Sequence, residues 1–139
     1  MADIALTAAQ ISRVFPDHDI VLSATLAAAV TAGQALYQVT TGKYGVADAN
    51  AANLQQVRGV ALQAGAAGQV IPMLRVGAVA GFTLTAQSHD DPIFLSDTAG
   101  AFADAAGTLE VPVGVIITMP DGSDTKVIYF DIRYGADWV

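Results

Sequence analysis

The stretch that decides the fold is residues 92–134, PIFLSDTAGAFADAAGTLEVPVGVIITMPDGSDTKVIYFDIRY. Residues 92–96 form a short apolar run typical of a strand, and the small and polar residues 97–107 have no helical pattern and predict a loop. In residues 111–119 and 126–134, apolar side chains recur at every second position, which is the period of a pleated strand. The expected apolar faces consist of Val111, Val113, Val115, Ile117 and Met119 in the first strand and of Ile128, Phe130, Ile132 and Tyr134 in the second.

The segment PDGSD at residues 120–124 joins these two strands. Its proline fixes φ, its aspartates bond to nearby backbone, and its glycine accepts a positive φ, so the segment has the chemistry of a turn. The two strands are therefore expected to form an antiparallel hairpin.

The rest of the chain shows the same short-strand pattern. Further strands are expected at residues 19–26, 35–39, 44–47 and 57–62, with a turn at 31–34 and one helical turn at 50–56. Residues 70–84 predict a longer strand that can bend at Gly77 and Gly81. Its expected apolar face consists of Val70, Pro72, Leu74, Val76, Ala78, Ala80, Phe82 and Leu84. Many short strands with almost no helix predict an all-β domain, a small antiparallel β-barrel or sandwich.

Residues 1–19 differ from the rest of the chain. Their apolar side chains are too few and too irregularly spaced for a stable element, yet too apolar for a purely solvated tail. Thr7 is placed to cap a single helical turn over residues 8–14. We expect an extended N-terminal arm at 1–19 that needs a partner surface, attached to one β-barrel-like domain at 20–139. The candidate contact residues of the arm are Ile4, Leu6, Ile11, Val14 and Phe15.

Composition limits the classes of partner. The chain has 139 residues, a length that is sufficient to bury a core without disulfides or a metal, and it contains no cysteine. Its formal net charge is -7, and its six basic residues are scattered. A protein that binds a phosphate backbone needs clustered lysine and arginine, so no nucleic-acid partner is expected.

One uncharged stretch, residues 20–42, is long enough to cross a bilayer. Its polar residues and its break at 31–34 favour two strands of soluble β-structure instead. The first residues, MADIALTAA, have an acid where a secretion signal has positive charge. No membrane partner is expected.

The groups that could carry chemistry are few. Residues 17–19 and 89–91 each place a histidine beside aspartates, but neither has the ligand spacing of a metal site, and both lie next to a proline in an expected surface turn. Ser96 has no nucleophile elbow around it. Residues 65–68 lack the lysine and the helix of a phosphate-binding loop. We therefore expect no metal, no cofactor and no enzymatic activity.

Two consecutive segments carry a family resemblance. FLSDTAGAFADAAGT at residues 94–108 and VPVGVIITMPDGSDTKVIYFD at 111–131 resemble the C-terminal half of the small capsid cement, or head decoration, proteins of tailed bacteriophages. Upstream, residues 2–17, 31–75 and 76–84 fit the same family pattern in the same order. The resemblance covers nearly the whole chain, and its specificity comes from the ordered succession of segments rather than from a catalytic motif.

The resemblance implies a structural protein that binds the outer surface of an assembled capsid. It implies that the protein bridges neighbouring subunits of the major capsid protein, that it is made in the host cytoplasm and resides on the virion, and that it self-associates on the shell, with a trimer as the expected form. The alternative is a carbohydrate- or receptor-binding β-module of a virion fibre, which would also be acidic and rich in strands. Tyr134 and Trp138 are candidate contact aromatics, with packing over a barrel end as the other interpretation.

We expect that removing divalent cations leaves the thermal stability of the protein unchanged, because the sequence has no cysteine and poor ligand spacing around His18 and His89. The measurement is the melting temperature by circular dichroism with and without a chelator. A fall of several degrees that added metal reverses would contradict this expectation.

Overall fold

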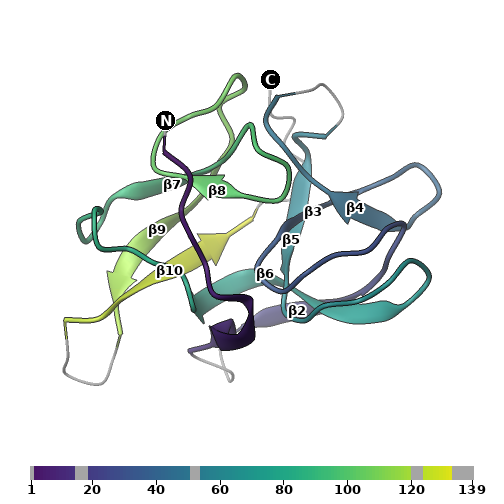
Figure 1. The fold of residues 1–139 in the computed structure, drawn as a ribbon, viewed down its shortest axis with the longest axis horizontal. Helices are drawn as coiled ribbons and strands as arrows, with labels where there is room; N and C mark the ends of the chain where they lie inside the picture. Colours follow the sequence, from purple (N-terminus) through teal and green to yellow (C-terminus); the bar gives the residue numbers. More distant parts are fainter. Residues whose placement is uncertain (1, 15–18, 51–53, 120–123, 133–139) are drawn as a thin grey trace.

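The computed structural model describes residues 2–14, 19–50, 54–119 and 124–132, and this part of the chain is built almost entirely from strands (Figure 1). The predicted all-β class is therefore confirmed. The only helical element among these residues is a 3-10 turn, η1 (Ala8–Gln10). The strands are β1 (Ser12–Arg13), β2 (Ile20–Thr25), β3 (Ala35–Gln38), β4 (Tyr44–Val46), β5 (Val57–Ala61), β6 (Val70–Ala80), β7 (Pro92–Leu95), β8 (Phe102–Ala103), β9 (Pro112–Thr118) and β10 (Lys126–Asp131).

All strand pairings are antiparallel, and the long strand β6 holds them together. The sheet runs in the order β4-β3-β5-β6-β10-β9-β7-β8, and β1 and β2 also pair with β6. Along one edge of β6, β2 pairs first and β1 follows. Along the other edge, β5 pairs first and β10 follows. In Figure 1, β7 to β10 gather on one side and β3 to β5 on the other, with β6 along the base.

The strands β3, β5 and β6 form a wall that is buried on both faces. Ala35 lies opposite Val60, and Val60 lies opposite Leu74, and all three belong to the larger hydrophobic core. Their neighbours in sequence, Leu36, Ala61 and Met73, belong to a second, smaller core. Because successive side chains of a strand point to opposite faces, the wall separates the two cores.

The sheet curls around each core from this wall. The smaller core lies between the wall, β2 and β4, and a parallel bridge between Leu26 and Tyr44 brings β2 and β4 together. The larger core lies between the wall and the four neighbouring strands β10, β9, β7 and β8. Its aromatic centre is formed by Phe102 and Phe130, whose ring centroids are 4.9 Å apart, with Phe82 against both.

The predicted C-terminal hairpin is confirmed by the pairing of β9 with β10, from Lys126 opposite Thr118 to Phe130 opposite Gly114. Ile128, Phe130 and Ile132 are buried as predicted. The expected turn residues 120–123 and the face residue Tyr134 lie outside the described residues. The segment 97–107, expected to be loop only, contains the two-residue strand β8.

The expected faces of β9 and β6 are partly wrong, and irregular pairing explains both errors. In β9, Val113 and Ile116 are both buried although they are an odd number of residues apart. The register against β7 passes from Gly114 to Pro112, so Val113 is an extra residue that shifts the alternation. In β6, Val70 is 60% exposed, and Ile71, Met73 and Val79 are buried instead. Arg75 is skipped in the pairing with β2, and both faces of β6 are covered, so a single apolar face does not exist.

Gly77 and Gly81 have φ values of 146° and 108°, which agrees with the predicted bend at the end of β6. The expected helical turn over residues 8–14 is shorter than predicted, since η1 covers only three residues. Thr7 precedes it but makes no capping hydrogen bond through its side chain.

The substitution Gly59→Ala is expected to lower the free energy of unfolding by about 1–3 kcal/mol, because a Cβ there would clash with the Cγ atom of Met73 in the smaller core. Urea unfolding of Gly59→Ala, Met73→Ala and the double variant measures the effect as a double-mutant cycle. In the Met73→Ala background, Gly59→Ala should cost much less. Equal costs in both backgrounds would show that the two residues do not pack against each other.

Candidate functional site

The N-terminal segment, residues 2–7, fills the gap between the two ends of the larger half of the sheet. On one side, the Ile4 N–H donates to the Phe102 carbonyl at 2.8 Å, and the Asp104 N–H donates to the Ala2 carbonyl at 3.1 Å. On the other side, the Thr7 N–H donates to the Gly81 carbonyl at 2.9 Å, and the Thr83 N–H donates to the Ala5 carbonyl at 2.8 Å. The segment thus joins β8 to residues 81–83, which continue from β6, as Figure 1 lets the reader follow.

Side chains reinforce this position. Ile4 is 5% exposed and belongs to the larger core. The Asp3 carboxylate accepts a hydrogen bond from the hydroxyl of the buried Ser96. Leu6 and Ile11 are half-buried, and both reach the loop at Gly33.

The expectation that residues 1–19 form an arm separate from the barrel is therefore revised for the described residues. Residues 2–7 complete the larger core, and β1 extends the pairing along β6. The apolar spacing misled the prediction because Ile4 is buried by strands nearly 100 residues away, a contact that no local pattern reveals. Of the other candidate contacts, Val14 is half-buried and Phe15 lies outside the described residues, as do Tyr134 and Trp138.

The expected absence of a metal site concerns two clusters. His89 and Asp90 are exposed, and the Asp91 carboxylate accepts the Ser88 N–H at 2.8 Å, an arrangement typical of a surface turn. Residues 17 and 18 lie outside the described residues. Within the ranges described by the structure, no three metal-ligating side chains lie together.

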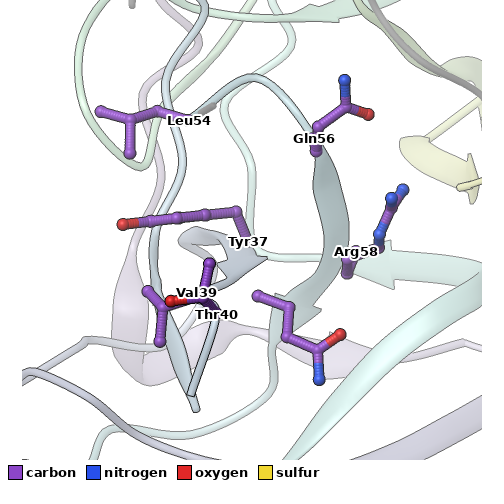
Figure 2. Close-up of a pocket in the computed structure, with 7 residues that line it drawn as sticks. Tyr37, Val39, Thr40, Leu54, Gln56 and Arg58 are labelled. Carbon is purple, nitrogen blue, oxygen red and sulfur yellow. The ribbon is translucent and has the colours of Figure 1, made fainter. Parts of the chain in front are cut away.

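A groove of about 560 Å³ lies beside the end of β3 and was not predicted from the sequence. Its lining includes Tyr37, Val39, Thr40, Leu54, Gln56 and Arg58. Figure 2 shows the Tyr37 ring between Leu54 on one side and Val39 and Thr40 on the other, with Gln56 and Arg58 across from it. The groove combines an aromatic ring with amide, hydroxyl and guanidinium groups, which is the chemistry of a site for a polar ligand with an apolar face.

A bulge in the pairing of β3 with β5 contributes to this groove. Leu36 lies opposite Gly59, and Tyr37 lies opposite Val57, so Arg58 is the extra residue. Bulges re-aim the side chain of the extra residue, and Arg58 lines the groove. No sequence signal identifies this groove in advance, because its lining residues belong to separate segments at 37–40 and 54–58.

Comparisons with known proteins give no match: no family model, no curated protein and no solved structure is similar to this chain. In the part of the chain that the structure describes, none of the helical segments has the length and apolar character needed to cross a membrane.

Ile4→Ala is expected to lower the free energy of unfolding by about 3 kcal/mol, because it removes buried methyl groups from the larger core. Ile20→Ala is the matched control: Ile20 is 43% exposed, so the same substitution should cost less than about 1 kcal/mol. Urea unfolding followed by circular dichroism measures both. Equal small losses would show that residues 2–7 do not belong to the folded core in solution.

Proposed function

We propose that this protein is a capsid decoration protein that binds the outer surface of an assembled phage shell and bridges neighbouring subunits of the major capsid protein. The observation that carries the proposal is the ordered resemblance of its segments to the cement proteins of tailed phages. Its two most family-like segments, 94–108 and 111–131, correspond to one group of neighbouring strands in the sheet, β7 to β10. The resemblance thus follows a folded unit rather than scattered residues.

The proposed role is thermodynamic. A protein that binds only the assembled lattice stabilises it by RT ln(1 + [L]/Kd), which is about 2.7 kcal/mol per site at a hundredfold excess over Kd. Stabilising the lattice by binding requires a rigid domain with a contact surface, and it requires no reacting groups. Bridging also requires each copy to contact more than one subunit, which self-association as a trimer on the shell would provide.

The proposed contact surface includes the outer side of the N-terminal region. Val14 and Ile11 remain half-buried rather than fully covered, and β1 beside them is exposed. A groove of about 240 Å³ lies here, lined by Ile11, Arg13, Val21 and Leu62 among others. A capsid segment placed on this surface would cover the apolar side chains that the domain leaves partly open.

The second candidate function is a carbohydrate- or receptor-binding β-module of a virion fibre. The groove at Tyr37 favours it, because a half-buried tyrosine ring beside glutamine and threonine side chains suits the apolar face and hydroxyl groups of a sugar. Binding of host envelope or glycan that Tyr37→Ala abolishes, with no binding to shells, would favour this candidate.

Adding the protein to undecorated shells of its own phage should raise the temperature at which the shells disassemble. Light scattering during heating measures that temperature, and co-sedimentation measures occupancy. No change in the shell's stability at saturating occupancy would count against the proposal.

A matched pair of variants tests the contact surface. Val14→Asp should weaken co-sedimentation with shells, whereas Val70→Asp should bind as the parent does. Val70 lies on the same strand as Ala78, whose carbonyl accepts the Val14 N–H, and the two residues are about 26 Å apart along that strand. Both variants must keep the parent's circular dichroism spectrum, and equal shell binding by the two would exclude this surface.

A further inference from the structure

The N-terminal segment, residues 2–7, is a short extended piece of chain held between two strand edges, formed by residues 81–83 and 102–104. We infer that this segment is exchangeable, and that the slot between β8 and residues 81–83 can receive residues 2–7 of a second copy of the chain. This inference is independent of the proposed binding to a capsid.

The slot has defined requirements for its occupant. It needs a backbone that bonds to Phe102 and Asp104 on one side and to Gly81 and Thr83 on the other. It also needs an apolar side chain at the position of Ile4, which fills the larger core. Without an occupant, both strand edges would be open, and open edges favour pairing with another chain. The sequence shown to meet these requirements is the chain's own, so an identical segment from another copy meets them equally.

The chain contains a suitable hinge directly after the segment. On the far side of the hinge, β1 pairs with β6, the Val14 N–H donates to the Ala78 carbonyl at 2.9 Å, and the Arg13 Nε lies 3.8 Å from the Asp19 Oδ2. Between this anchored region and residues 2–7 lies η1, which has no buried residue and no capping side chain. Its three residues can open without uncovering any core.

The geometry limits how copies can be arranged. Three residues that change from a 3-10 turn to an extended chain span at most about 10 Å, so the receiving slot must lie close to the donor's own hinge. The same contacts form in the exchanged and the unexchanged arrangement. Their free energies therefore differ only by the entropy lost when two chains associate and by any new contacts at the interface. At high local concentration, as on a surface covered with copies, exchange is favoured by mass action.

Cysteine cross-linking of the full chain tests the inference, and the natural sequence contains no cysteine to interfere. Asp3 and Ala103 are a bridge pair flanked by the hydrogen bonds of Ile4 and Asp104, and hence a non-hydrogen-bonded pair. Such pairs have Cα atoms about 4.5 Å apart, within the range that a disulfide spans. The variants Asp3→Cys and Ala103→Cys are refolded together at high concentration and then oxidised. The matched control replaces Asp3→Cys by Ala5→Cys, which is also exposed but pairs with the other edge.

We expect disulfide-linked dimers between residues 3 and 103, identified by mass spectrometry, at a yield several-fold above that of the Ala5→Cys control. The double variant Asp3→Cys/Ala103→Cys, refolded dilute and oxidised so that each segment is locked in its own slot, should then form no exchanged dimers with unlocked chains. A yield equal to the control's would overturn the inference.

A second measurement needs no substitution, in case the loss of the Asp3 hydrogen bond to Ser96 weakens the fold. Labelled and unlabelled copies of the natural chain are refolded together, and isotope-filtered nuclear Overhauser spectra are recorded. Contacts between residues 4 and 102 of different copies would support exchange. Contacts within single copies alone, at every concentration tested, would overturn it.

Discussion

The structure depends on a wall of three strands, β3, β5 and β6, that is buried on both faces. A strand with one wet face needs apolar side chains at alternate positions only, whereas a strand covered on both faces needs them at consecutive positions. Ala35 with Leu36, Val60 with Ala61, and Met73 with Leu74 meet that need. One member of each pair enters the larger core and the other enters the smaller core, so two cores share a single layer of backbone.

This arrangement explains why the ends of the sheet matter. The smaller core is closed by the bridge between Leu26 and Tyr44. The larger core has β8 at one end and the continuation of β6 at the other, and residues 2–7 lie between them. The first residues of the chain therefore complete a core to which the last third of the chain contributes half of the buried residues. Burial of Ile4 and the bonds on both sides compensate for the segment's lack of any stable local structure.

The two candidate surfaces, the groove at Tyr37 and the region around β1, lie near irregularities in the strand pairing. The bulge at Arg58 in the wall re-aims a charged side chain toward the groove at Tyr37. The bulge at Arg75 and the bend at Gly77 lie where β6 leaves the wall, and β1 pairs with β6 just beyond them, at Val79 and Ala80. The proposed decoration role needs contact surfaces on a rigid frame, and in this fold each candidate surface includes residues of the wall strands.

The sequence by itself determined the all-β class, most strand positions and the hairpin of β9 and β10, because a period of two and the chemistry of turns are local properties. It also located the bend at Gly77, since glycine is the residue that accepts such a backbone conformation. Only the tertiary structure decided which faces of β6 and β9 are buried, because a bulge depends on the partner strand's register. It alone placed Ile4 in the core and assembled the groove from residues 37–40 and 54–58, because those contacts join segments distant in sequence.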